Sequence, residues 1–199
     1  MTIDRKENIS MDKKYLYLII AAYATSSFST GIFTPVYAFF VQKIGGGILE
    51  ASWAIGVYSI ITGLGTILIH QTAWSQRNRM TLLWLGWFFW LLSIAVYAVM
   101  TNIYLMYISQ VLGALGVAME EPIFNAELSQ RASSNLYVGW ALFGGITEIF
   151  TGIAAISGGV IATFYGFEVL INCMVGVALF SFSLIVFYIY ALKKHGAAK

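Results

Sequence analysis

The sequence predicts an all-α membrane protein with six transmembrane helices, arranged as two three-helix repeats inserted in opposite orientations. Three observations lead to this fold class. The 199 residues are 59% hydrophobic and only 10% charged, which is far more apolar than an ordinary soluble domain. The apolar residues are grouped in segments of about 20, enough to cross a hydrocarbon core of roughly 30 Å. Finally, matching landmarks recur along the chain at one constant spacing.

Six apolar segments are expected to cross the membrane as helices, because barrel strands would be shorter and would alternate between apolar and polar residues. A polar tail, residues 1–14, precedes them and does not look like the basic leader of a signal peptide. A second tail, residues 193–199, follows them. The six-helix domain covers residues 15–192, with spans at about 15–41, 49–69, 82–100, 103–124, 137–165 and 167–192.

The first span carries a polar stripe. Ser26, Thr30, Thr34 and Tyr37 are spaced by four, four and three residues, which places them along one face of a helix. A polar face on a membrane helix turns toward protein or water rather than lipid. The stripe therefore predicts a substrate or proton pathway. The alternative is hydrogen bonding between helices without any ligand. Pro35, inside the stripe, is expected to bend the helix.

Basic residues are distributed unequally between the two sides of the membrane. Six spans place both tails, the loop after the second span and the loop after the fourth on one side. Ten of the eleven lysines and arginines lie there, and only Lys43 lies on the other side. By the positive-inside rule, both tails are expected in the cytoplasm, with the protein in the plasma or bacterial inner membrane. The ten are Arg5, Lys6, Lys13, Lys14, Arg77, Arg79, Arg131, Lys193, Lys194 and Lys199.

Two adjacent carboxylates stand in the fourth span, in the stretch "GVAMEEPIFNAELSQ". Glu121, Asn125 and Ser129 repeat the spacing by fours that marks the first span. We therefore expect Glu121 and Asn125 to face the same pathway as the polar stripe. The alternative is that the fourth span ends early, which would place Glu120 and Glu121 among the lipid headgroups. Pro122 is expected to bend this helix as Pro35 bends the first.

Glu120 points about 100° away from Glu121 on a helix. It shares a side with Gly113 and Gly116, small residues that suit close helix packing. We expect Glu120 to meet a neighbouring helix rather than the pathway. Glu127 lies nearer the cytoplasm, and we expect it to be solvated.

The fifth span holds another deep carboxylate, Glu148, flanked by Thr147 and Thr151. None of the six spans contains a lysine or an arginine, so neither Glu148 nor Glu121 has an obvious ion-pair partner. Carboxyl groups inside a membrane can take part in proton relays, so both are candidates for a proton pathway. The alternative for Glu148 is a neutral packing residue that is hydrogen-bonded to its neighbours.

Other chemistry finds little support. Cys173 is the single cysteine, which excludes an intrachain disulfide, and His70 and His195 form no metal-ligand cluster, so we expect neither metal nor cofactor. His70 is expected at the membrane interface. The chain has no basic patch suited to nucleic acid. An intramembrane serine protease would need a histidine in a span near Ser157, and an aquaporin-like channel would need asparagine–proline–alanine turns. Since the chain has neither, we expect no enzyme.

An internal repeat of 87 positions relates the two halves of the chain. Pro35 and Pro122 are separated by this offset, and so are Trp53 in "SWAIG" and Trp140 in "GWALF". Because each unit has three spans, the second copy must enter the membrane upside down. Inverted repeats of this kind are common in secondary transporters, where the substrate site lies near the midplane. The predicted repeats cover about residues 15–100 and 103–192.

Six spans in an inverted 3+3 repeat, with cytoplasmic tails and a basic loop after the second span, resemble one half of a major facilitator superfamily transporter. The loop "QTAWSQRNRMTLL" lies where that family has a signature of the form G-x-x-x-D-R-x-G-R. Arg79 fits the closing arginine, and Arg77 lies within the motif. The other signature positions depart from the pattern and hold Gln71, Ser75, Gln76 and Asn78.

Two further segments resemble motifs of the same family. The stretch "TGIAAISGG" in the fifth span is similar to a glycine-rich motif, without its proline, and contributes Gly152, Gly158 and Gly159. The stretch "QVLGALGVA" in the fourth span resembles an arginine-led glycine motif, with Gln110 in the place of the arginine. The resemblance covers residues 14–193.

This resemblance implies that the first and fourth helices line a cavity, and that the chain carries a small solute by alternating access, with or without coupling to protons. Family transporters usually have two six-helix halves, so it also implies a homodimer, or pairing with another half, in the lipid bilayer. The second helix of one half would pack on the fifth of the other, where Gly152, Gly158 and Gly159 allow close approach. The alternative is a structural or regulatory membrane protein, or a fragment, that kept the half-fold and lost transport. No motif identifies the substrate.

Overall fold

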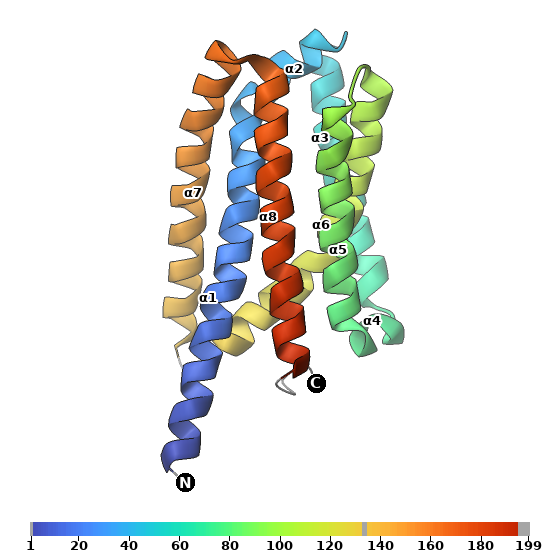
Figure 1. Cartoon of the computed structure of the whole chain (residues 1–199). Helices are drawn as coiled ribbons and strands as arrows, with labels where there is room; N and C mark the ends of the chain where they lie inside the picture. Colours follow the sequence, from blue (N-terminus) through green and yellow to red (C-terminus); the bar gives the residue numbers. More distant parts are fainter. Residues whose placement is uncertain (1, 133–134, 195–199) are drawn as a thin grey trace.

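A computed structural model provides the structure of residues 2–132 and 135–194, and these described residues form helices and no strands. Six of their helical segments are long and apolar enough to cross a membrane. The segments stand side by side in a bundle, with the two ends of the chain at the same, lower end in Figure 1. The predicted fold class, an all-α protein with six transmembrane helices, is confirmed.

The first span is interrupted at Pro35. α1 (Thr2–Phe33) is followed directly by a short 3-10 helix, η1 (Thr34–Val36), and then by α2 (Tyr37–Lys43). Proline has no backbone N–H, and its ring clashes with the preceding turn, so a helix loses a hydrogen bond at proline and either bends or breaks there. A 3-10 turn is a common form for such a connection. The polar stripe of this span therefore crosses a break in the helix.

The fourth span, α6 (Ile103–Arg131), is longer than the predicted span of 103–124 and contains Pro122 in its interior. The side-chain oxygens of Asn102 and Asn135 cap the starts of the fourth and fifth spans by accepting backbone N–H groups. Figure 1 shows the last part of α6 running obliquely across the lower end of the bundle. The other elements are α3 (Ile48–His70), α4 (Ala73–Arg77), α5 (Arg79–Ala98), α7 (Leu136–Phe164) and α8 (Gly166–Lys194).

The helix contacts form two corresponding sets. α1 packs against α7 and α8, whereas α6 packs against α3 and α5. A shift of 87 positions relates the first set to the second, which is the pairing that an inverted repeat requires. The repeat itself stays a prediction. α5 also contacts α8, and α1 meets α6, so the two proline-containing spans approach each other inside the bundle.

Buried serines help to fix the rotation of α1 and α6 about their own axes. Ser29 of α1 donates a hydrogen bond of 2.9 Å to the carbonyl oxygen of Met174 on α8. Ser109 of α6 donates one of 3.0 Å to the carbonyl oxygen of Ser93 on α5. In a membrane such bonds contribute about 0.6–2 kcal/mol each. They help to determine which face of each helix is left for a cavity.

Gly113 and Gly116 lie at the contact between α5 and α6. A Cβ atom at Gly116 would lie 2.7 Å from the carbonyl oxygen of Gly86 and 2.7 Å from the backbone nitrogen of Trp90. One at Gly113 would lie 3.2 Å from the hydroxyl of Ser93. The two backbones therefore approach more closely than any larger residue at position 116 would allow.

The glycines of the fifth span do not act as one set. Gly158 is buried against the backbone of Ile32, so it packs α7 onto α1 within a single chain. We expected it at a contact between two copies, and this position corrects that expectation. Gly152 and Gly159 have open space beside them. Their place at an interface between halves stays a prediction.

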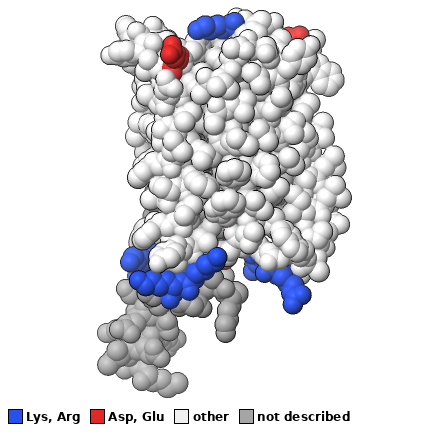
Figure 2. Space-filling model, turned by 45° about the vertical axis from the view of Figure 1, so that its right-hand side comes forward, with Lys and Arg blue, Asp and Glu red and all other residues white. Residues whose placement is uncertain are grey.

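The surface agrees with a multi-pass membrane protein. Figure 2 shows charged side chains at the two ends of the molecule and none in the belt between them on the face presented. Large apolar side chains cover the outside, among them Ile60, Leu68 and Ile156, each more than half exposed. Such a surface suits lipid rather than water. We call the end where α1 begins and α8 ends the basic end, since it carries Arg77, Arg79, Arg131, Lys193 and Lys194.

Candidate functional site

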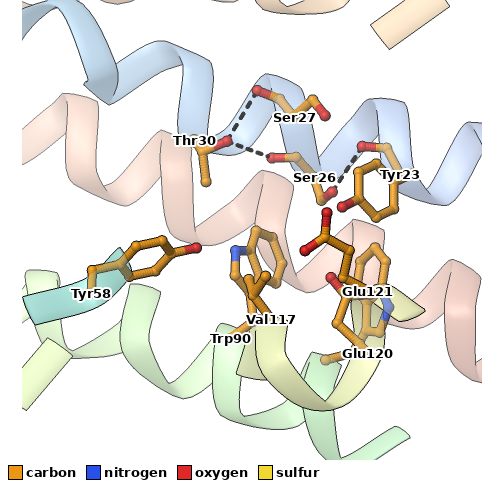
Figure 3. A pocket seen from close by; sticks show the side chains of 10 residues that line it. Tyr23, Ser26, Ser27, Thr30, Tyr58, Trp90, Val117, Glu120 and Glu121 are labelled. Carbon is orange, nitrogen blue, oxygen red and sulfur yellow. Dashed lines mark hydrogen bonds between the residues drawn. The ribbon is translucent and has the colours of Figure 1, made fainter. Parts of the chain in front are cut away.

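A cavity of about 210 Å³ lies where α1 and α6 approach each other. Four helices contribute to its lining, which combines carboxylates, hydroxyls and aromatic rings (Figure 3). We call it the acidic–aromatic pocket. Its lining residues are Tyr23, Ser26, Ser27 and Thr30 from α1, Tyr58 from α3, Trp87 and Trp90 from α5, and Val117, Glu120 and Glu121 from α6.

The α1 wall of this pocket holds the first part of the predicted polar stripe. The Ser26 hydroxyl donates to the carbonyl oxygen of Tyr23 at 2.8 Å. The Thr30 hydroxyl donates to the carbonyl oxygens of Ser26 and Ser27, at 3.2 and 3.3 Å, as the dashed lines in Figure 3 show. Both hydroxyl protons are therefore used within α1, and each oxygen keeps lone pairs as an acceptor.

The rest of the stripe borders a second cavity, of about 260 Å³, which we call the apolar pocket. Thr34 and Tyr37 line it, and Thr30 belongs to both cavities. Gln110 of α6 supports its wall, because its Nε2 donates to the hydroxyls of Tyr37 at 3.1 Å and Tyr97 at 3.3 Å. The stripe is thus divided between two neighbouring cavities. The remaining lining residues are Phe33, Ile55, Ile94, Tyr97 and Met174.

Glu121 lies on the face of α6 that turns toward α1. Figure 3 shows its carboxylate directed from α6 across the pocket toward the α1 helix, as the shared spacing predicts. The side chain is exposed in the single chain. α6 continues to Arg131, about 15 Å further along the helix, so the helix does not end at Glu121.

Glu120 is only 6% exposed and also lines the pocket. It packs against Gly86 of α5, as its helix face predicts, but we expected it to lie away from the pathway, and that part was wrong. The pocket extends into the angle between α5 and α6, so two residues about 100° apart on α6 both reach it. The Oε2 atom of Glu120 accepts no hydrogen bond from the described residues. The indole N–H of Trp87 interacts with this carboxyl but does not meet hydrogen-bond geometry.

Two tyrosines complete the polar environment of the carboxylates. The hydroxyls of Tyr23 and Tyr58 both interact electrostatically with Glu120 and with Glu121. Among the described residues that line the pocket there is no lysine or arginine. The arrangement offers two acids, several oxygen acceptors and aromatic rings, and it supplies no positive charge of its own.

Asn125 and Glu148 line neither cavity. Asn125 is half-buried, one turn beyond Glu121 on α6. Glu148 is exposed on α7, and the hydroxyls of its neighbours Thr147 and Thr151 donate to carbonyl oxygens of their own helix. The structure thus brings Ser26, Thr30 and Glu121 together and leaves Asn125 and Glu148 apart from them. A role for these two residues in a pathway stays a prediction.

Glu127 is buried rather than solvated, which corrects our expectation. It accepts a hydrogen bond of 2.7 Å from the hydroxyl of Tyr188 on α8 and pairs with Arg131 on its own helix, with 3.3 Å between Oε2 and Nη2. The Arg131 guanidinium also lies over the ring of Tyr15, 5.5 Å from its centroid. The spacing of four residues between Glu127 and Arg131 is typical of an ion pair on one helix face, and it is the sequence signal for this contact.

The basic loop forms a separate feature at the basic end. Arg77 closes α4 and Arg79 opens α5, and both are exposed. They border a cavity of about 210 Å³ that Lys193 and Glu127 also line. Nearby, His70 Nε2 lies 3.0 Å from the carbonyl oxygen of Ala118 on α6. None of these groups reaches the acidic–aromatic pocket.

The aromatic part of the site was not predicted. Tyr37 was the only aromatic residue expected at the pathway, whereas four rings from three helices line the pocket, those of Tyr23, Tyr58, Trp87 and Trp90. Tyr23 stands three residues before Ser26, so the stripe could have been extended to it. The other three needed the relative rotation of α3, α5 and α6, which no local pattern contains.

The fold and the site together define a multi-pass helical membrane protein with a carboxylate-bearing pocket between its spans, which is the arrangement of a membrane transport protein. The sequence profile of the Major Facilitator Superfamily matches residues 19–199, nearly the whole chain. The chain belongs to that superfamily, whose members are transporters, and its six spans fit a half-size member. Comparisons with curated proteins and with solved structures found no match.

Proposed function

We propose that the chain is a carrier in which a small solute binds in the acidic–aromatic pocket and crosses the membrane by alternating access. The observation that carries this proposal is the pocket itself. It lies between α1 and α6, the two spans that share polar faces, and brings Glu120 and Glu121 of α6 close to the hydroxyl groups of α1. Carboxylates within spans are costly to maintain, and they commonly mark substrate or proton paths.

A second six-helix half would complete the path. Thr30, Thr34 and Glu121 are exposed in the single chain, and polar groups are costly against lipid. A second copy, related by a two-fold axis along the membrane normal, would cover this face and enclose a central cavity. A different half would serve equally. The apolar residues of α3 and α7, such as Ile60 and Ile153, are exposed and available for the contact.

Coupling to protons is part of the proposal. Glu120 and Glu121 are the acids of the pocket, and Tyr23 and Tyr58 are the other ionisable groups that face them. An inward proton gradient is then expected to drive uptake. Glu120→Gln or Glu121→Gln, at whichever carboxylate carries the proton, should abolish the dependence of uptake on the proton gradient. Flux down the gradient of the solute should remain. Uptake that is indifferent to the gradient in the unmodified protein contradicts proton coupling and leaves the carrier proposal intact.

The basic end is proposed to face the cytoplasm, because it holds most of the lysines and arginines. A cysteine near Gly46, placed at the exposed Ile48 where α3 begins at the other end, should react with an impermeant thiol reagent only from outside the cell. Since Cys173 is exposed, the experiment needs a Cys173→Ser background. Labelling of position 48 only after the membrane is opened contradicts this orientation.

A membrane protein that kept the half-fold without transport is the second candidate. The basic loop favours it, because the position of the signature aspartate holds Ser75. That serine is buried, and its hydroxyl donates to the carbonyl oxygen of Thr72 at 2.7 Å, within the short α4 turn. The loop is therefore built for local structure at a position where the family has a charged group.

Counterflow in reconstituted vesicles separates the two candidates. Vesicles are loaded with an unlabelled solute, and uptake of the same labelled solute is followed for a panel of small amines, sugars and organic acids. A carrier accelerates labelled uptake when the inside is preloaded, which neither a leak nor a channel does. Protein-free vesicles are the control. If no solute shows acceleration over protein-free vesicles, the chain is not a carrier.

A further inference from the structure

We propose that the acidic–aromatic pocket binds an organic cation, with the positive head group between its carboxylates and rings and the apolar body of the molecule in the apolar pocket. The inference rests on the proposed function for its meaning in transport. Binding can nevertheless be measured without transport. Four features of the two pockets support a cation: their charge, an unsatisfied acceptor, the aromatic lining and their shape.

Charge is the first argument. Glu120 and Glu121 lie in one pocket, and no lysine or arginine among the described residues lines it. The basic residues of the chain lie at the ends of the spans rather than inside them. A solute with a positive charge would supply what the pocket lacks, whereas an anion would meet two acids without a counter-charge.

The second argument is an acceptor that is not fully satisfied, because the indole N–H of Trp87 interacts with the Glu120 carboxyl but does not meet hydrogen-bond geometry. The Glu120 side chain is 6% exposed, and its Oε2 atom accepts no hydrogen bond from the described residues. Leaving a buried acceptor unsatisfied costs about 1–3 kcal/mol, and more for a charged group. The hydroxyls of Ser26 and Thr30 cannot remove this cost, because their protons are donated to α1 carbonyl oxygens. An ammonium or guanidinium group bound in the pocket would donate the missing hydrogen bond.

Aromatic rings form the third argument. Tyr23, Tyr58, Trp87 and Trp90 bring four π-systems to a cavity of about 210 Å³. Cations are attracted to the faces of such rings, most strongly to tryptophan. A small inorganic cation would instead need about six oxygen ligands around it. A lining in which four of the ten residues are aromatic therefore favours a carbon-substituted ammonium over a metal ion.

Shape gives the size of the molecule. The acidic–aromatic pocket is smaller than the roughly 300–1,000 Å³ of pockets for drug-sized ligands, so it suits a head group rather than a whole molecule. The apolar pocket shares Thr30 with it and is walled by Phe33, Ile94 and Met174. The adjoining cavities match a molecule with a charged end and an apolar end.

The test is binding of tritiated 2-phenylethylammonium to the purified protein in lipid nanodiscs, with two competitors of similar size. 2-Phenylethanol is neutral and 3-phenylpropanoate is anionic, and both keep the phenyl group. We expect saturable binding of the cation, with both competitors weaker by at least about tenfold. Equal competition by the three compounds, or no saturable binding, overturns the proposal. This comparison uses the unmodified protein, so it does not depend on whether a variant folds.

Variants then place the bound cation in the pocket. Glu120→Gln and Glu121→Gln keep the side-chain shape and remove one charge, and each should weaken binding by about tenfold or more. Trp90→Leu should weaken it by about 3- to 30-fold. Matched controls are Glu168→Gln, an exposed acid at the start of α8, and Trp84→Leu, a ring of α5 outside the pocket, and both should bind as the unmodified protein does. Equal effects of pocket and control substitutions overturn the assignment.

Counterflow distinguishes failure of this inference from failure of the proposed function. If the cation binds but preloading does not accelerate its uptake, the binding site stands and the carrier proposal fails. If preloading accelerates uptake only for a neutral or anionic solute, and that solute outcompetes the cation, the carrier proposal stands and the cation site is wrong.

Discussion

α6 carries two acidic sites about two turns apart, and they differ in how their charge is met. Glu127, near the basic end, pairs with Arg131 and accepts a hydrogen bond from Tyr188. Glu120 and Glu121, deeper in the span, have no cation among the described residues around their pocket. The first site is completed by the chain. The second is not completed by any described residue and is open to a ligand.

This difference separates a structural role from a functional one. A buried acid with a partner on its own helix and another on α8 ties two elements together, and it offers little to a ligand. A buried acid with an unsatisfied oxygen destabilises the empty protein and gains by binding a proton or a cation. On this basis, removing an acid should affect the fold at Glu127 and ligand binding at Glu120 and Glu121. The predictions below follow this division, from the largest expected effect to the smallest.

The first prediction is that a second copy of the chain covers the acidic–aromatic pocket. Crosslinking between two copies tests it and gives an all-or-none result. Two differently tagged copies are co-expressed in a Cys173→Ser background, one with Ile60→Cys and the other with Ile153→Cys. If two copies face each other over the pocket, with α3 of one packed on α7 of the other, an oxidant should crosslink the tags together in native membranes. The matched control replaces Ile153→Cys by Leu179→Cys, which is equally exposed, at 53%, but lies on α8. If neither pair of cysteines crosslinks, the homodimer is wrong, and pairing with a different six-helix half is the remaining account.

Glu127→Gln should give the largest loss of stability. The substitution removes the negative member of a pair whose side chains are each 6% exposed. Taking one partner from a buried ion pair costs about 3–5 kcal/mol. Unfolding by an anionic detergent, followed by tryptophan fluorescence, measures the change, with the exposed Glu168→Gln as a control that should stay within about 0.5 kcal/mol. A loss for Glu127→Gln no larger than the control's would show that this pair does not hold the fold.

The difference between the two acidic sites was only partly predictable. The spacing by fours on the first and fourth spans predicted that Ser26, Thr30 and Glu121 share a direction, because residues on one helix face depend only on local geometry. Whether Glu120 also reaches the pocket depends on how α5 and α6 pack against each other. Gly116 and Gly86 let the two backbones approach closely at this point. No pattern within one helix contains that information.

The ends of the helices also show which features depend on local sequence and which depend on tertiary contacts. Uniformly apolar segments ended close to the predicted positions, as for α7 (Leu136–Phe164) against 137–165. The prediction for the fourth span stopped at Phe124, because polar residues follow it. The helix continues since Glu127 and Arg131 satisfy each other on one of its faces. A charged stretch was taken as the end of a span, and it is in fact the part that anchors α6 to α8.

Tyr188→Phe should give a smaller loss at the same site. It removes the 2.7 Å hydrogen bond to Glu127 and leaves both the carboxylate and Arg131 in place. Hydrogen bonds to charged groups contribute about 1.5–3 kcal/mol, so the loss should be below that of Glu127→Gln. The same unfolding assay measures it. In the Glu127→Gln background Tyr188→Phe should cost less than it does alone, because its acceptor has lost its charge. Fully additive losses would mean that the two groups are not coupled.

Glu120→Gln should give the smallest effect on stability, within about 1 kcal/mol and in the stabilising direction. The amide keeps the shape of the side chain, removes the cost of a buried charge, and takes away no hydrogen bond, since Oε2 accepts none from the described residues. The variant should therefore unfold no more easily than the unmodified protein in the assay used for Glu127→Gln, while its affinity for 2-phenylethylammonium falls. This opposition between stability and binding is typical of functional sites. If Glu120→Gln instead destabilises the protein as much as Glu127→Gln does, then Glu120 has a structural partner, and the two sites on α6 do not differ in kind.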